Sequence, residues 1–454
     1  MRFDVVSIFP QYFDVLDLSL VGKARKRGLL SIKIHDLRDY ASDPHKTVDD
    51  TPYGGGPGMV MRPDIWGKAL DDIMGPESPG SGMKVLAVPT PSGEPLSQRT
   101  IEGLAHSSDQ IIFACGRYEG IDERVTEHYR QRSDVWVLEY SMGDYIVNGG
   151  EVAALAVIEA VGRLVEGVVG NTESVKQESF SEEGLLESPV YTKPATWRGI
   201  NVPEVLTKGN HKAIERWRRD RALERTLKQR PDLIRRINGH DLDIHDRELL
   251  ASLGVLVSPT YANFSMRLAQ PDDAQALATL AARLFPMACP KDLDRQSIQR
   301  HIDEEFSLDK FTHMLAQPDT YRIMLGYVSI SGSTKELIAY SLVENISLDS
   351  KPSHPEVAKV VPPGTAELSK LYVDKAWQGS GVAGVLMQSS FDDIHGLSPE
   401  APAVVVSTHE RNKRADIFYR RHGFRKVGKR TYNVGGQNMS DNVYLAALRG
   451  HDIN

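Results

Sequence analysis

The residues most suited to chemistry lie in one short segment, residues 140–151. The segment combines three glycines and two tyrosines with two carboxylates, Asp144 and Glu151. Because glycine has no side chain, the pair Gly149 and Gly150 lets the backbone pass close to a ligand or to another part of the chain. An apolar helical run, residues 152–158, follows directly. The pattern predicts either a ligand-binding loop or a surface loop that leads into a buried helix.

Two further loops follow stretches that are typical of buried strands. Residues 89–93 follow one such stretch, and residues 115–124 follow another. Ligands of open α/β sheets bind beyond the carboxyl ends of the strands, so these loops and residues 140–151 predict one shared site. Each loop alone is more often a plain turn. A further loop, residues 51–61, has four glycines within five positions but lacks the Lys-Ser/Thr of a P-loop, which argues against a nucleoside triphosphate.

Alternating strands and helices are predicted to position these loops. The strand patterns are short, apolar and bounded by turn residues, and helical patterns separate them, which is α/β organisation over residues 1–165. Strands are expected at residues 3–9, 30–37, 85–89 and 110–114, and helices at residues 13–27 and 97–106.

The chain beyond residue 165 divides into further parts. Residues 166–180 have no apolar period and predict a flexible link, and residues 181–256 predict a small helical domain. Residues 257–264 predict a linker to a second α/β region, residues 265–454.

The composition is that of a soluble globular protein, with 41% hydrophobic and 25% charged residues. No apolar run approaches the ~20 residues that span a bilayer, and the first residues lack the pattern of a signal peptide, so we expect a cytoplasmic protein without membrane contact. The two cysteines, Cys115 and Cys289, argue against a disulfide framework and a cysteine-rich zinc site, and we assign no metal ligands.

The net charge of −7 argues against nucleic acid as a partner, but the charge is unevenly distributed. Residues 208–236 carry eleven Lys and Arg against four Asp and Glu, a local balance of +7. This cluster predicts either a surface that binds a polyanion or the solvated face of a packed helix.

The glycine-rich loops are similar, in sequence and in order, to the signature segments of a known family. They read Tyr-Gly-Gly-Gly-Pro-Gly-Met-Val-Met, Cys-Gly-Arg-Tyr-Glu-Gly-Ile-Asp-Glu-Arg and Ser-Met-Gly-Asp-Tyr-Ile-Val-Asn-Gly-Gly-Glu. Over residues 1–255 the chain resembles the bacterial tRNA (guanine-N1)-methyltransferases of the SPOUT class. The resemblance implies an α/β domain with a trefoil knot, a topology that chains otherwise avoid. It also implies a homodimer that uses S-adenosylmethionine to methylate N1 of the guanine 3′-adjacent to the tRNA anticodon.

The resemblance also implies which residues act. Neutral guanine N1 carries a proton, so the reaction needs a base and a group that stabilises the developing charge. By position the base is Glu178, where the family has an aspartate, and the arginine is Arg163; the alternative for Arg163 is a helix-end cation that complements the dipole. The cofactor contacts would be Thr90, Pro91, Gly116, Tyr118, Glu119, Ser141, Met142, Gly143, Asp144, Tyr145, Ile146, Val147, Gly149 and Gly150.

The basic cluster supplies the candidates for contact with tRNA. Its arginines Arg216, Arg218 and Arg219 are expected to meet phosphates, and each phosphate contact should add to the salt dependence of binding. Two residues that precede these arginines in the chain, Asn210 and His211, are weaker candidates. They are expected either to contact tRNA or to cap a helix.

Two ordered motifs in residues 265–448 resemble the GNAT superfamily of N-acetyltransferases. They read Gln-x-x-Gly-x-Ala from Gln378 and Asn-x-x-Ala-x-x-x-Tyr-x-x-x-Gly-Phe from Asn412. The first overlaps a G-x-G-x-x-G pattern, but it lies too far after its strand for a Rossmann fingerprint and suits a pyrophosphate cradle at a helix N-terminus. By resemblance Tyr419 is the acid for the leaving thiolate, and Glu367 is a candidate base or one half of a salt bridge. The acetyl-CoA contacts would be Leu371, Val373, Gln378, Gly379, Ser380, Gly381, Val382, Ala383, Asn412 and Tyr419.

Two alternatives stay open on the sequence alone. The second α/β region is either an acetyltransferase of an unknown amine or a degenerate module that binds or only adds surface. The whole chain is either an enzyme or a tRNA-binding protein that senses S-adenosylmethionine; Arg163 and the carboxylate of Glu178 favour the enzyme, because a pure binder needs neither.

Overall fold

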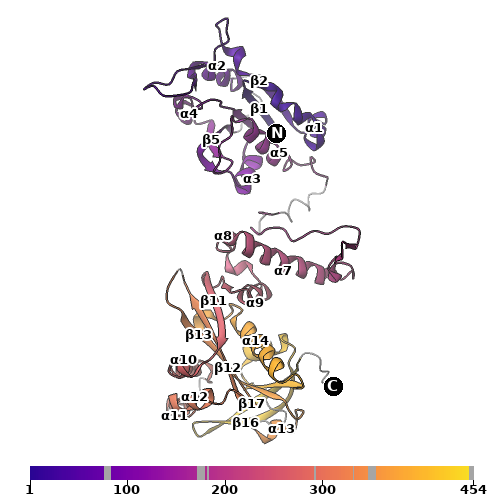
Figure 1. Ribbon diagram of the computed structural model, residues 1–454, viewed down its shortest axis with the longest axis vertical. Helices are drawn as coiled ribbons and strands as arrows, with labels where there is room; N and C mark the ends of the chain where they lie inside the picture. Colours follow the sequence, from indigo (N-terminus) through magenta and orange to yellow (C-terminus); the bar gives the residue numbers. More distant parts are fainter. Residues whose placement is uncertain are drawn as a thin grey trace. The chain divides into compact units, whose positions relative to one another are not determined.

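The computed structural model describes residues 1–75, 83–170, 179–180, 184–290, 293–330, 332–345 and 354–448. The chain divides into two compact units, Met1–Glu182 and Glu183–Asn454 (Figure 1). Within the described ranges, none of the helices combines the length and the apolar character that crossing a bilayer requires.

Unit 1 is built on a five-stranded parallel sheet with the strand order β2-β1-β6-β5-β7. Helices α1, α3 and α5 cover one face around Phe3 and Phe113, and α2 and α4 cover the other around Trp66 and Tyr129. The predicted α/β organisation of this region is therefore confirmed. Its elements are β1 (Arg2–Ser7), η1 (Pro10–Asp17), α1 (Ser19–Lys26), β2 (Ser31–Asp36), η2 (Leu37–Tyr40), β3 (Asp49–Asp50), β4 (Val60–Met61), α2 (Pro63–Ile73), β5 (Lys84–Pro95), α3 (Gln98–Ser107), β6 (Gln110–Ala114), α4 (Glu123–Arg130), β7 (Val135–Ser141) and α5 (Glu151–Gly162).

Unit 1 differs from the sequence-based prediction in four details. Residues 13–27 form two helices rather than one, because the backbone of Leu18 is extended and interrupts the helix. At this break Gly22 lies so close to Asp17 that a Cβ on Gly22 would be 2.0 Å from the carbonyl oxygen of Asp17. Strand β7 was not predicted, and β5 continues through the loop expected at residues 89–93. Val168, in the link predicted to be flexible, is buried in the core.

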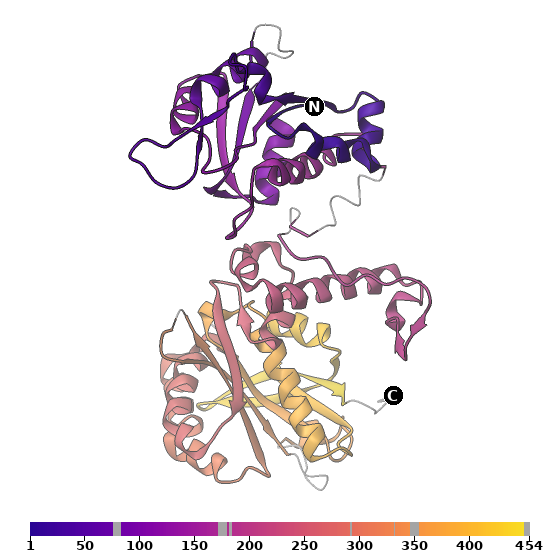
Figure 2. The same cartoon turned by 45° about the horizontal axis from the view of Figure 1, so that its top comes forward.

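Unit 2 contains an eight-stranded sheet with the strand order β10-β11-β12-β13-β14-β15-β17-β16. All its pairings are antiparallel except that of β14 with β15. Helices α10 to α12 pack against one face and α14 against the other (Figure 2). The elements are β10 (Val255–Leu256), β11 (Ala262–Leu268), η5 (Pro271–Asp273), α10 (Ala274–Ala288), α11 (Arg295–Glu305), α12 (Leu308–Leu315), β12 (Tyr321–Ser329), β13 (Glu336–Glu344), α13 (Pro355–Ala358), β14 (Ala366–Val373), η6 (Lys375–Trp377), α14 (Val382–Leu397), β15 (Ala403–His409), α15 (Lys413–Arg421), β16 (Arg425–Val434) and β17 (Gln437–Ala447).

A helical module precedes this sheet and is joined to it. Its helices pack around Leu223, Ile234 and Leu250, and strand β10, directly after them, is the edge strand of the sheet. Residues 262–264, expected in a linker, are the first residues of β11. The module consists of β8 (Thr196–Trp197), β9 (Ile200–Asn201), η3 (Glu204–Leu206), α7 (His211–Gln229), α8 (Pro231–Ile234), η4 (Gly239–Asp241) and α9 (Ile244–Ser252).

Candidate functional site

The loops after β6 and β7 of unit 1 meet at their glycines. The backbone N–H of Gly150 donates to the carbonyl oxygen of Gly116 at 3.0 Å, and Arg117 forms an isolated bridge with Gly149. A Cβ on Gly150 would lie 3.0 Å from Cα of Cys115 and 3.1 Å from Cγ of Pro89. Glycine at this position therefore suits a close approach of three segments, because a side chain would be tightly packed there.

The loop within β5 joins the same place. Pro89 and Glu94 both lie opposite Tyr140 of β7, so the intervening residues leave the strand and return to it. A Cβ on Gly93 would be 2.4 Å from the backbone nitrogen of Tyr140. The structure thus brings the three predicted loops together beside the carboxyl ends of β6 and β7.

An ion pair whose carboxylate is fully buried joins two of these loops, and the sequence alone assigned no role to it. Glu151, the first residue of α5, is fully buried, and its Oε1 accepts hydrogen bonds from Ser7 Oγ at 2.7 Å and Arg117 Nε at 3.2 Å. The Arg117 guanidinium also lies over the rings of Phe9 and Tyr12. The only sequence signal was a carboxylate directly after two glycines.

The predicted cofactor residues form the rim of this place. Tyr118 has φ +57 and an exposed ring, and Met142, Tyr145, Ile146 and Val147 are exposed apolar side chains. Thr90, Pro91, Glu119 and Asp144 have intermediate or exposed side chains. Ser141 is buried, and its Oγ accepts from the N–H of Gly143 at 3.2 Å. Burial raises the pKa of Cys115, whose thiol is therefore protonated and unsuited to act as a nucleophile.

Of the two predicted catalytic residues, the structure describes only Arg163. Glu178 lies outside the described residues. Arg163 is the C-cap residue of α5, whereas Gly150 is the N-cap, so a rise of 1.5 Å per residue separates their backbones by about 20 Å.

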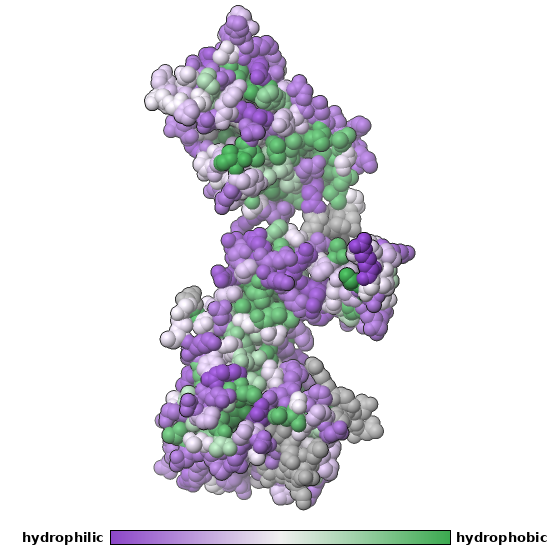
Figure 3. All heavy atoms as spheres, viewed as in Figure 1, coloured by the Kyte–Doolittle hydropathy of each residue, from purple (hydrophilic) through white to green (hydrophobic). Residues whose placement is uncertain are grey.

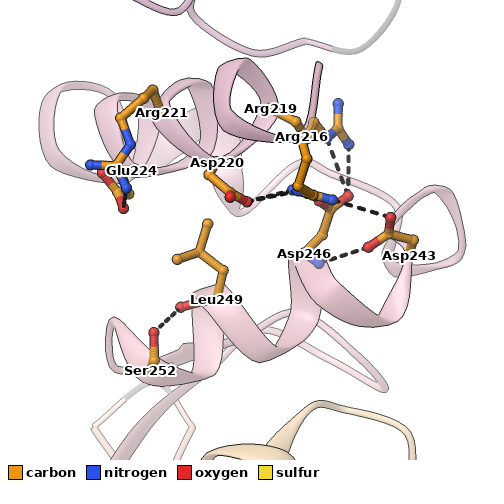
Figure 4. Close-up of polar contacts among 9 residues, drawn as sticks. All are labelled: Arg216, Arg219, Asp220, Arg221, Glu224, Asp243, Asp246, Leu249 and Ser252. Atoms are coloured by element: carbon orange, nitrogen blue, oxygen red, sulfur yellow. Dashed lines mark hydrogen bonds and ion pairs between the residues drawn. The ribbon is translucent and has the colours of Figure 1, made fainter. Parts of the chain in front are cut away.

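Two of the three predicted tRNA-binding arginines hold helix α7 to helix α9. Arg216 Nη2 lies 2.6 Å from Asp246 Oδ1, and Arg219 Nη2 lies 3.1 Å from Asp246 Oδ2 (Figure 4). Asp246 is only 3% exposed, so this is a structural ion-pair cluster. Arg218 is exposed. Asn210 caps α7 by accepting from the N–H of Ala213 at 3.2 Å, which confirms the capping alternative.

Unit 2 contains a cavity of about 710 Å³ between strands β14 and β15. The two strands pair only at Ala366 with Val404 and at Glu367 with Val405, and beyond that point they diverge. Eight of the ten predicted acetyl-CoA residues line the cavity, while Ser380 and Val382 are buried beside it. The lining includes Leu371, Val373, Gln378, Gly379, Gly381, Ala383, Asn412 and Tyr419.

The individual groups differ in what they can do. Burial raises the pKa of Tyr419 above its usual range, so its phenol keeps a proton that it can donate. Asn412 caps α15 by accepting from the N–H of Ala415 at 3.1 Å. Glu367 is buried, and its Oε1 accepts from Arg430 Nη1 at 3.0 Å. This is the salt-bridge alternative for Glu367, and it leaves that carboxylate poorly placed to act as a base.

Two family models match successive parts of the chain. Residues 1–236 match the family model described as tRNA (Guanine-1)-methyltransferase TrmD, and residues 346–426 match the acetyltransferase (GNAT) domain. The tRNA (guanine-N(1)-)-methyltransferase of Thermobifida fusca (strain YX) is 54% identical over 258 residues, which cover 56% of this chain and 97% of the relative. That of Kineococcus radiotolerans is 54% identical over 258 residues (56% and 91%), and that of Bifidobacterium animalis subsp. lactis is 49% identical over 268 residues (57% and 97%).

Proposed function

The chain belongs to the tRNA (guanine-1)-methyltransferase family and carries a GNAT domain, and from this premise we propose its specific reaction. The chain transfers the methyl group of S-adenosylmethionine to N1 of the guanine 3′-adjacent to the tRNA anticodon. The observation that carries this proposal is the convergence of three glycine-bearing loops beside the carboxyl ends of β6 and β7.

The residues at this place fit S-adenosylmethionine. The close approaches at Gly93 and Gly150 support a threaded, knotted backbone there, since side chains would keep the segments apart. The exposed rings of Tyr118 and Tyr145 and the apolar Ile146 offer faces on which an adenine could lie. Ser141 and Gly143 are joined by hydrogen bonds, which stabilise the conformation of this loop.

The reaction requires proton removal and charge stabilisation from this chain's own residues. S-adenosylmethionine supplies an electrophilic methyl group on its sulfonium sulfur. The carboxylate of Glu178 takes the N1 proton as N1 forms its bond to the methyl carbon and the carbon–sulfur bond breaks. The guanidinium of Arg163 stabilises the negative charge that develops on the guanine.

We propose a homodimer on two grounds. The backbone separation of about 20 Å between Gly150 and Arg163 favours a site completed by a second copy of the chain. Hydrophobic side chains also gather on the visible face of unit 1 over α1 (Figure 3). Val15, Leu18 and Leu20, in and just before α1, are exposed apolar residues. Val152, at the start of α5, is exposed as well. Exposed apolar surface of this kind is typical of a protein interface.

The test of the reaction uses labelled S-adenosylmethionine and undermodified tRNA. The full-length protein is expected to transfer label to tRNA that carries a guanine 3′ of the anticodon. Replacing that one guanine by adenine should remove the incorporation, because adenine lacks both the N1–H that the proposed base accepts and the exocyclic oxygen on which negative charge develops. Label that persists on the replaced tRNA would refute the proposed position.

We propose that tRNA phosphates contact the helical module through Arg218 rather than through Arg216. Arg218→Ala is expected to lower the slope of log affinity against log salt by about one, because one phosphate contact is lost. Arg216→Ala is the matched control: it removes a partner of buried Asp246 and should lower the melting temperature instead. Binding measured over a series of salt concentrations separates the two, and an unchanged slope for Arg218→Ala would exclude that contact.

We also propose that residues 265–454 bind acetyl-CoA and acetylate an amine. The slot between the diverging strands β14 and β15 supports this, because it is large enough for the pantetheine arm and is lined by the motif residues. In the reaction the amine nitrogen bonds to the thioester carbonyl carbon and releases a proton to solvent, the carbon–sulfur bond breaks, and Tyr419 gives its proton to the thiolate and regains one from solvent. Calorimetry with acetyl-CoA on the full-length chain tests binding.

A further inference from the structure

Helix α9 of the helical module lies against the glycine loop that precedes α14. A Cβ on Gly381 would be 2.5 Å from the carbonyl oxygen of Arg247, so backbone meets backbone there. Arg247 Nη1 donates to the carbonyl oxygen of Gly379 at 3.1 Å, and Ala251 packs in a core cluster with Val382. Strand β10, three residues beyond α9, is the edge strand of the large sheet and fixes this arrangement.

The carboxylate of Glu248, which belongs to α9, packs against the first turn of α14. A Cβ on Gly384 would be 2.5 Å from Glu248 Oε1, which means that the carboxylate fills the space beside this glycine. The same oxygen accepts from Arg421 Nη2 at 2.6 Å and lies 3.3 Å from His422 Nε2. Burial alone would raise the pKa of Glu248, but the hydrogen bond from His422 and the neighbouring positive charges outweigh it and hold that pKa below its usual range. Glu248 is therefore an anion at neutral pH.

This position is suited to an anion from outside the chain as well. The N-cap residue of α14, Gly381, has φ +95, and no side chain caps the helix. The unpaired N–H groups and the dipole of a helix N-terminus attract negative charge. Arg421 and Glu248 also line the cavity proposed for acetyl-CoA. The phosphates of a bound CoA and the carboxylate of Glu248 would thus contact the same Arg421 side chain and the same N-terminus of α14.

We propose that Glu248 competes with the phosphate groups of acetyl-CoA for the first turn of α14, Arg421 and His422. The inference rests on the proposed binding of acetyl-CoA. When the cofactor enters, the Glu248 side chain leaves, and Arg421 and His422 contact the phosphates instead. The helical module, which carries Glu248, therefore sets the cofactor affinity of the acetyltransferase-like domain. Asp246, two residues earlier on α9, holds Arg216 and Arg219 of α7, so one helix is shared between the candidate tRNA surface and the cofactor loop (Figure 4).

The test compares acetyl-CoA with S-acetylpantetheine, which lacks the phosphates, by calorimetry on the full-length protein. Glu248→Gln keeps the shape and removes the charge, and it is expected to bind acetyl-CoA about tenfold more tightly than the unmodified chain. S-acetylpantetheine should bind both proteins equally. Glu248→Asp, which withdraws the charge by one methylene, should give an intermediate affinity for acetyl-CoA, and Arg421→Ala should weaken it.

The control is Glu224→Gln, which removes a carboxylate that pairs with Arg221 at 2.6 Å on α7, away from the cofactor loop. It should leave both affinities unchanged, and a melting curve for each variant shows that it is folded. Equal or weaker binding of acetyl-CoA by Glu248→Gln would overturn the competition while leaving acetyl-CoA binding in place. The absence of heat with acetyl-CoA for every folded variant would overturn the proposed acetyl-CoA site itself, and the competition with it.

Discussion

Glu178→Gln is expected to lower the rate of methyl transfer by about 10²–10⁴-fold, the usual effect of losing a general base. Glutamine keeps the length of the side chain but cannot take the proton from guanine N1. N1 therefore stays protonated and is a weak nucleophile toward the methyl group. Binding of S-adenosylmethionine should be unchanged, because the loops that we assign to the cofactor end at residue 150. Single-turnover transfer to tRNA and equilibrium binding of the cofactor measure the two effects separately.

Two variants control for this result. Glu173→Gln changes a carboxylate of the same link, five residues earlier, and should leave the rate unchanged. Glu178→Asp restores the residue type that the family resemblance implies and should retain most of the activity. Near-normal turnover by Glu178→Gln would remove Glu178 from the mechanism.

Glu151→Ala is expected to destabilise unit 1 by about 3–5 kcal/mol, the usual effect of removing one partner of a buried ion pair. The substitution leaves the Arg117 guanidinium beneath the loops without its carboxylate and removes the acceptor of Ser7. Because Arg117 bridges to Gly149, the affinity for S-adenosylmethionine should fall with the stability. Urea unfolding with and without S-adenosylmethionine measures both, since a ligand shifts only the transition of the unit that binds it.

Glu159→Ala is the matched control for this prediction, because it makes the same substitution at an exposed position of the same helix. It should move the unfolding midpoint by no more than a surface substitution does, within about 0.5 kcal/mol. An unchanged midpoint for Glu151→Ala would show that the ion pair does not hold the loops.

The elements of unit 1 were predicted where the pattern is local. The fully buried strand β6 was predicted with its observed bounds, because residues buried on both faces form an uninterrupted apolar run. Strand β7 was missed because Trp136 is exposed and Glu139 is charged, as an edge strand allows. The ion pair of Arg117 with Glu151 was missed because its partners are 34 residues apart. They meet only after β6 and β7 have both paired with β5.

The charge of the basic cluster shows the limit of counting along the chain. The balance of +7 over residues 208–236 does not include Asp243 and Asp246, which lie just beyond it in sequence. Folding places both carboxylates against Arg216, and Asp246 against Arg219 as well. The cluster is therefore less positive in the folded protein than in the sequence, and Arg218 is the exposed candidate.

The sequence by itself determined the methyltransferase family, because long ordered motifs such as residues 115–124 and 140–151 specify residue types whose roles depend on identity and local order. Only the tertiary structure decided which charged groups are available to a ligand. Arg216 is occupied by an aspartate 30 residues away, and the cradle at Gly381 is shared with Glu248, whose partner Arg421 lies 173 residues further along the chain. The reason is physical: electrostatic attraction depends on distance in space, and the folded backbone sets that distance.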